Sequence, residues 1–85
     1  MDGGREDSVT VTFNGQDKEI PYEPHASISA LLEHAKQAFG VQSNHLLALF
    51  NQAGVELKDD QSAQAAGVEP GALLVLRQST VKGGA

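Results

Sequence analysis

The sequence predicts an α+β fold in which one amphipathic helix packs across a small mixed sheet of four to five strands. Three observations lead to this prediction: a tight hairpin signal, a single helical stretch, and two later apolar runs bounded by turn residues. With 85 residues and 40% hydrophobic content, the chain is sized for one domain with one apolar core. We expect residues 1–8 to be a disordered N-terminal tail, residues 9–78 the folded domain, and residues 79–85 a flexible C-terminal tail.

The first two strands are predicted from a hairpin pattern. Residues 9–13 read VTVTF, and this strict alternation of apolar and polar side chains is typical of a half-buried strand. The pair Asn14-Gly15 favours a type I′ turn, because both residues tolerate a positive φ. The returning strand lies in KEIPY, residues 18–22. Pro21 has no backbone N–H to donate, so this strand is predicted to lie at an edge of the sheet.

A helix is predicted next, between Ser27 and Gly40. Ser27 can cap its N-terminus, and Gly40 stands where a left-handed C-terminal cap is needed. The apolar residues between them recur at helical spacing and predict one buried stripe; they are Ile28, Leu31, Leu32, Ala35 and Phe39.

Two apolar runs after the helix, residues 45–50 and 70–77, are too short for independent helices and are predicted to be strands. Pro70-Gly71 makes the turn into the last strand. Leu57, between the two runs, either belongs to a further short strand or fills the core. A hairpin, a crossing helix and a strand returning beside the first form the β-grasp arrangement.

Several stretches resemble the ubiquitin-like family, in the order in which that family has them. They are EPHASI (23–28), LALF (47–50), LKDDQSAQAAGV (57–68), VLR (75–77) and Gly83-Gly84. The chain departs from ubiquitin in its tight first hairpin, which lacks an apolar tip, and in Lys82, where ubiquitin has arginine. The resemblance is to a ubiquitin-like protein, of the bacterial kind, rather than to ubiquitin itself.

The resemblance implies a protein modifier that performs no catalysis. A protease would remove Ala85, and the carboxylate of Gly84 would then be adenylated, passed to a thiol and joined to a lysine amine of a target protein. The implied partners are the processing protease, an activating (adenylating) enzyme, a conjugating enzyme and target lysines. Gly83 and Gly84 lack a Cβ, so this stretch can enter a narrow channel.

A second site is predicted from strand alternation. If Leu46, Ala48 and Phe50 face the helix, then their neighbours in sequence face away from it. Together with the outward positions of the last strand they would form an apolar partner-binding patch. Its members are Leu47, Leu49, Leu73, Val75 and Arg77. This location matches that of the apolar patch by which ubiquitin is recognised.

Composition argues against several other functions. The net charge of −5 and the scattered basic residues disfavour nucleic-acid binding, and no apolar run approaches the length of a membrane span. The chain has no cysteine, and neither its three histidines nor Glu56 with residues 58–60 have the spacing of a metal site, so we expect no metal, no cofactor and no catalytic residue. We therefore expect a monomeric cytoplasmic protein.

Two alternatives to the modifier remain open. The first is a β-grasp sulfur carrier that forms a C-terminal thiocarboxylate, although such tails normally end at the second glycine and Ala85 follows it here. The second is a binding module that is not conjugated and acts only through its sheet.

Overall fold

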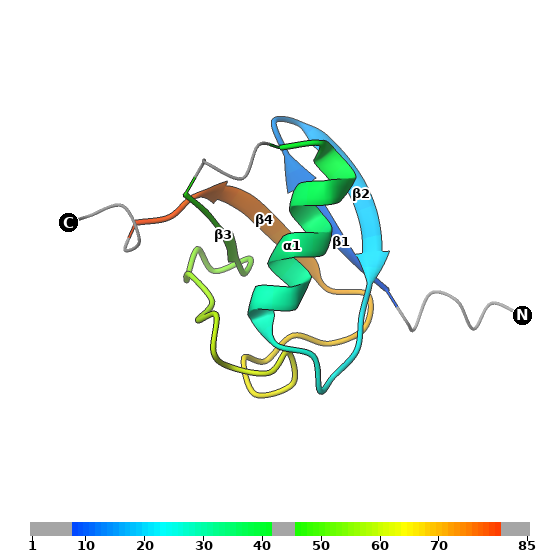
Figure 1. The fold of residues 1–85 in the computed structure, drawn as a ribbon, viewed down its shortest axis with the longest axis vertical. Helices are drawn as coiled ribbons and strands as arrows, with labels where there is room; N and C mark the ends of the chain where they lie inside the picture. Colours follow the sequence, from blue (N-terminus) through cyan, green and yellow to red (C-terminus); the bar gives the residue numbers. More distant parts are fainter. Residues whose placement is uncertain (1–7, 42–45, 81–85) are drawn as a thin grey trace, which may run out of the picture.

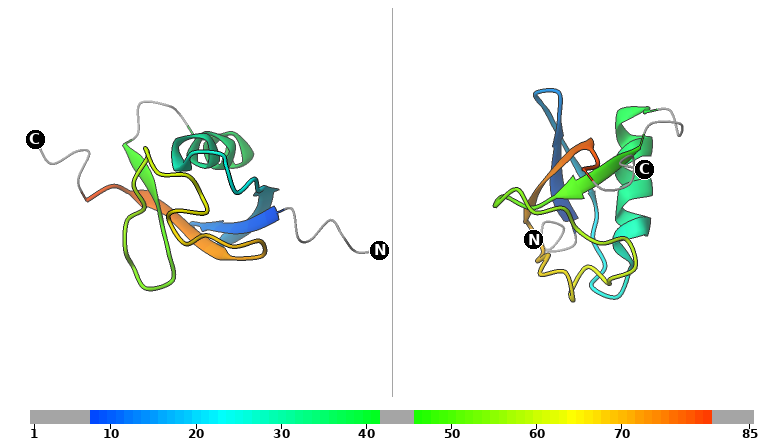
Figure 2. Two further views of the ribbon diagram at one scale, coloured as in Figure 1. Left: turned by 90° about the horizontal axis from the view of Figure 1, so that it is seen from below. Right: turned by 90° about the vertical axis from the view of Figure 1, so that its left-hand side faces the viewer.

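The computed structural model describes residues 8–41 and 46–80, which form one mixed sheet and one helix (Figure 1). The elements in chain order are β1 (Ser8–Phe13), β2 (Gln16–Pro21), α1 (Ile28–Phe39), β3 (Leu47–Phe50) and β4 (Leu73–Gln78). The strand order is β2-β1-β4-β3, in which β1 and β4 are parallel and the other two pairs are antiparallel. The helix crosses one face of this sheet (Figure 2), so the predicted architecture is confirmed.

The hairpin that joins β1 and β2 forms as its turn residues predict. Asn14 and Gly15 both have positive φ, 53° and 81°, and the flanking strands pair in register from Phe13 and Gln16 outward. β2 is an edge strand, and Pro21 is its last residue. β1 begins one residue earlier than predicted, because Ser8 pairs with Pro21 and so belongs to the sheet rather than to the tail.

Both ends of α1 carry the predicted caps. The side chain of Ser27 accepts a hydrogen bond from the backbone N–H of Ala30 at 3.1 Å. Gly40 adopts the left-handed conformation with φ 66°, and its N–H and that of Val41 donate to carbonyls of the last helical turn. These bonds satisfy backbone groups that have no partner inside the helix.

The core lies between α1 and the sheet and extends under the long loop between β3 and β4. Val9 and Val11 of β1 and Leu31 of α1 are at most 1% exposed. The loop adds buried Leu57, Ala63 and Val68. Leu57 therefore fills the core; in the described ranges this loop contributes isolated bridges but no fifth strand.

The predicted orientation of β3 is wrong. Leu47 and Leu49 are 7% and 0% exposed and belong to the core cluster, whereas Leu46 is 50% exposed. The physical reason is the pairing with β4: Leu49 lies opposite Leu76, and directly paired residues share one face of a sheet. Since Leu76 faces the core, Leu49 does too. All four residues of this strand are apolar and buried. Its sequence therefore has no alternation of apolar and polar residues that could indicate which face is turned to the core.

Candidate interaction face and tail exit

The sheet face turned away from α1 is built around Val75. In the sheet register Val75 lies between Thr12 of β1 and Phe50 of β3. We call this surface the outer face. Its members, taken from the pairing of β1, β4 and β3, are Thr10, Thr12, Ala48, Phe50, Leu73, Val75 and Arg77. Leu73 and Val75 are half-buried, so apolar atoms of both remain accessible at its centre.

Arg77 covers part of this face. Its guanidinium carbon lies 4.3 Å from the centroid of the Phe50 ring, a cation–π arrangement. Phe50 is only 2% exposed, although it points away from the main core. The outer face therefore presents a cation stacked on an aromatic ring beside two half-buried aliphatic side chains, rather than a broad leucine surface.

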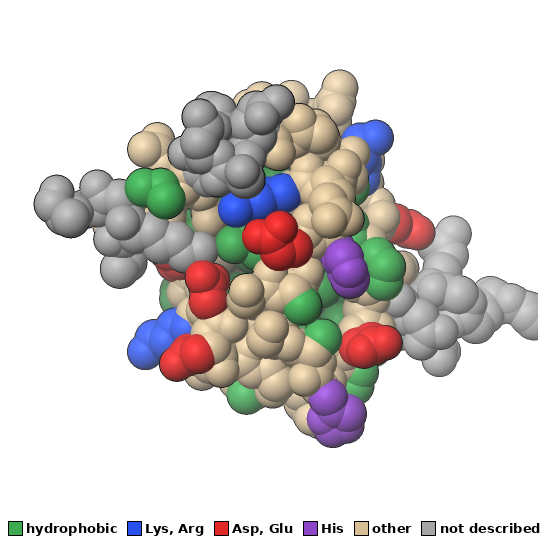
Figure 3. All heavy atoms as spheres, viewed as in Figure 1, with side chains coloured by type: hydrophobic (Ala, Val, Ile, Leu, Met, Phe, Trp, Pro, Cys, Tyr) green, Lys and Arg blue, Asp and Glu red, His purple; other side chains and the backbone are tan. Residues whose placement is uncertain are grey.

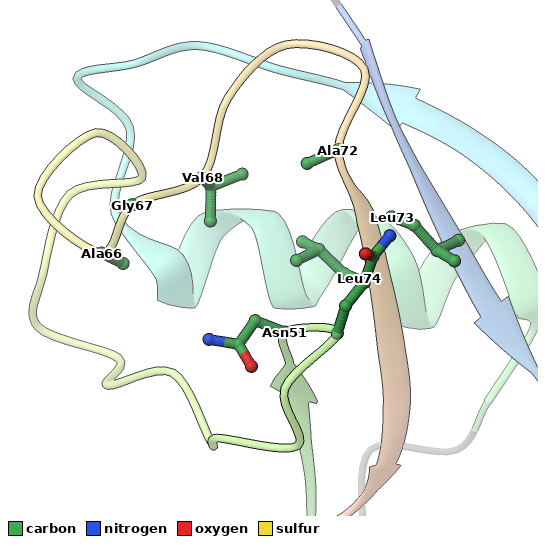
Figure 4. A pocket seen from close by; sticks show the side chains of 8 residues that line it. Asn51, Ala66, Gly67, Val68, Ala72, Leu73 and Leu74 are labelled. Atoms are coloured by element: carbon green, nitrogen blue, oxygen red, sulfur yellow. The ribbon is translucent and has the colours of Figure 1, made fainter.

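This geometry revises the predicted partner-binding patch. Leu73, Val75 and Arg77 lie together on the outer face as predicted. Leu47 and Leu49 do not, because they face the core, and they are withdrawn from the patch. Figure 4 shows Leu73 and Leu74 on opposite sides of β4, in agreement with this assignment.

A shallow hollow of about 270 Å³ borders the outer face at Leu73 (Figure 4). Its lining comes from the turn after β3, the end of the long loop and the start of β4. The lining residues are Asn51, Gln52, Ala66, Gly67, Val68, Ala72, Leu73 and Leu74. Asn51 shapes the rim, since its side-chain oxygen accepts hydrogen bonds from the N–H groups of Ala53 and Val55. None of the lining side chains can ionise, so they offer no acid or base for catalysis.

The first two residues of the predicted C-terminal tail are held on the body. The N–H of Ser79 donates to the carbonyl of Leu46 at 2.9 Å, and its hydroxyl donates to Glu56 Oε2 at 2.6 Å. Glu56 Oε1 accepts from both the N–H and the hydroxyl of Thr80, at 2.9 and 3.0 Å. Residues 79 and 80 of the segment expected to be a flexible tail therefore both have hydrogen-bond partners on the folded domain. Gly83, Gly84 and Ala85 lie outside the described residues.

Glu56 is the residue of this region that sequence reasoning missed. It lies 23 residues before Ser79, and its local sequence indicates only an acidic turn. No helical or strand spacing joins the two positions, so only the folded arrangement of β3, its following turn and β4 brings them together. Within ranges 8–41 and 46–80 no group of three acidic or histidine side chains could hold a metal ion.

The helix side of the molecule carries more charged side chains than the outer face does. Acidic, basic and histidine side chains are interspersed there and break the apolar atoms into small separate areas (Figure 3). On this side, Lys36 Nζ and Glu33 Oε2 lie 3.9 Å apart at the surface of α1. No helix in the part of the chain that the structure describes is long and apolar enough to cross a membrane.

Comparison with solved structures identifies the fold. ATBAG1, solved in complex with HSP70, superposes with a TM-score of 0.73 at 19% identity; the match covers 87% of this chain and 41% of that one. A de novo designed protein based on ubiquitin gives a TM-score of 0.75 at 22% identity and covers 92% of this chain and 94% of its own. No protein-family model matches the sequence, and no curated protein matches it. One helix on a four-stranded mixed sheet, together with the likeness to a ubiquitin-based design, makes this an α+β fold of the ubiquitin-like β-grasp type.

Proposed function

We propose that this protein is a ubiquitin-like modifier, joined through the carboxylate of Gly84 to lysines of target proteins after cleavage between Gly84 and Ala85. The observation that carries the proposal is that residues 79 and 80, just before the diglycine in the sequence, are still attached to the folded domain. β4 ends at Gln78, and Thr80, the last residue that the structure describes, is hydrogen-bonded to Glu56. Only two residues, Val81 and Lys82, separate Thr80 from the diglycine in the sequence.

For conjugation, this chain has to supply only a C-terminal carboxylate that the partner enzymes can bind. A protease hydrolyses the bond between Gly84 and Ala85. The freed carboxylate attacks the α-phosphate of ATP and releases pyrophosphate, an enzyme thiol displaces AMP, and a lysine amine displaces the thiol to form an amide. The activating enzyme, the conjugating enzyme and the protease supply every catalytic group.

The outer face is the proposed recognition surface for these enzymes and for readers of the modified targets. Burying the accessible parts of Leu73 and Val75 would contribute at most roughly 1.5–3 kcal/mol each, before the costs of association. Such a contribution alone gives weak binding, so the Arg77 cation is expected to add specificity by pairing with an acidic partner group.

Conjugation is tested in the cells that make the protein, with the full chain tagged at its N-terminus and purified under denaturing conditions. We expect a mature form lacking the mass of one alanine, and tryptic peptides in which a target lysine carries Gly-Gly, because trypsin cuts after Lys82. A matched control is the chain lacking residues 83–85. Finding neither a mature end nor branched peptides would overturn the proposal. A mature end heavier by the difference between sulfur and oxygen would instead indicate a sulfur carrier.

A second candidate is a binding module that is not conjugated. The observation that favours it is the similar fold of ATBAG1, which was solved in complex with HSP70. In this case removal of residues 83–85 leaves partner binding unchanged, whereas Val75→Glu on the outer face abolishes it. A conjugated modifier is sensitive to both changes.

A further inference from the structure

One side chain fastens the root of the C-terminal segment. Both carboxylate oxygens of Glu56 accept hydrogen bonds, Oε2 from the Ser79 hydroxyl and Oε1 from the N–H and hydroxyl of Thr80, at 2.6 to 3.0 Å. Three bonds from two consecutive residues converge on one group. We call this arrangement the Glu56 clamp.

Besides its bond to Glu56, Ser79 has a second attachment to the folded domain. The N–H of Ser79 bonds the carbonyl of Leu46, immediately before β3, while Glu56 follows the turn after β3. Ser79 is therefore hydrogen-bonded on both sides of β3, to the residue before the strand and to a residue after the turn that follows it. Ser79 is only 8% exposed. A carboxylate is a strong hydrogen-bond acceptor, so the three bonds to Glu56 add to the attachment that Ser79 already has through Leu46.

We propose that Glu56 is a positioning residue: it sets Thr80 as the fixed root from which the acyl-donating tail departs. This inference rests on the proposed function. Its consequence is a defined reach. From Thr80 to Gly84 the chain spans four residues, at most about 14 Å when fully extended, whereas from Gln78 it would span six residues and about 21 Å.

A fixed root matters because the partner enzymes must hold the body and the terminal glycine together. When Thr80 is held, the maximum extended length up to Gly84 is a third shorter than it would be from Gln78. Holding Thr80 also sets the direction in which the tail starts, relative to Arg77 and the outer face. Less conformational freedom is then lost when body and tail bind together. The clamp is thus expected to raise the rate of transfer without touching the reacting atoms.

The clamp itself is tested by amide hydrogen exchange in Glu56→Ala, Glu56→Gln and the control Glu69→Ala, which removes an exposed carboxylate elsewhere. We expect the Thr80 amide to exchange about tenfold faster in Glu56→Ala. Glu56→Gln should restore most of the protection, because its amide oxygen can still accept that N–H. Tryptic cleavage after Arg77 should accelerate in Glu56→Ala relative to cleavage after Lys82. Unchanged exchange at Thr80 would refute the clamp.

The functional role is tested by the yield of lysine conjugates from the same full-length variants, expressed in the native cells at matched levels. We expect a loss of severalfold for Glu56→Ala, recovery for Glu56→Gln, and no change for Glu69→Ala. Equal yields from wild type and Glu56→Ala, despite faster Thr80 exchange, would overturn the positioning role alone. Absence of conjugates from the wild type would overturn the proposed function, while the exchange result would still report on the clamp.

Discussion

Replacing Leu49 by alanine tests the orientation of β3, on which the outer face depends. Leu49 is fully buried in the core cluster and lies opposite Leu76. Removing its three outer carbons loses their transfer free energy and leaves a cavity, at a cost of about 2–5 kcal/mol. A domain of this size has a total stability of about 4–13 kcal/mol at 0.05–0.15 kcal/mol per residue, so the variant should be severely destabilised.

The assay is urea unfolding followed by circular dichroism, with Leu46→Ala as a matched control. Leu46 precedes β3 and is half exposed, so its truncation should change the free energy of unfolding by no more than about 0.5 kcal/mol. The midpoint should fall for Leu49→Ala with little change in slope. Equal losses in the two variants, or a larger loss for Leu46→Ala, would refute the assigned orientation and restore the leucine patch.

Three other changes test two side-chain hydrogen bonds and one backbone conformation by the same unfolding measurement. Tyr22→Phe removes the hydroxyl that donates to the Val68 carbonyl at 2.8 Å, and should cost about 1–2 kcal/mol because the buried acceptor is left unsatisfied. Ser27→Ala removes the N-terminal cap of α1 and should cost about 1 kcal/mol. Gly40→Ala meets no neighbouring atom but places a side chain at φ 66°, and should cost about 1–2 kcal/mol. A neutral result would contradict the hydrogen bond assigned to Tyr22 or Ser27, or the left-handed conformation assigned to Gly40.

The elements that the sequence predicts correctly are those fixed by neighbouring residues. Asn14-Gly15 specifies its turn through the backbone conformations that the two residues tolerate. Ser27 and Gly40 specify the helix ends through bonds that span three to five residues. In each case the interacting groups lie within one turn of chain, so local pattern and folded structure agree.

The errors arise where partners are distant in sequence. β3 is apolar on both faces because Phe50 is covered from outside by Arg77, which lies across the strand pair and 27 positions later. Its sequence therefore cannot indicate which face is inner. Glu56 appears as one acidic residue among several, and nothing near it indicates that Ser79 and Thr80 lie within hydrogen-bond distance.

The parallel pairing of β1 with β4 has a consequence for biosynthesis. The two central strands are 60 residues apart, at 8–13 and 73–78, and neither can complete its ladder without the other. A nascent chain held by the ribosome thus exposes the hairpin and the helix with no sheet interior to cover them. Closure waits until residue 78 has left the exit tunnel, so this domain is expected to fold in one late step rather than progressively during translation.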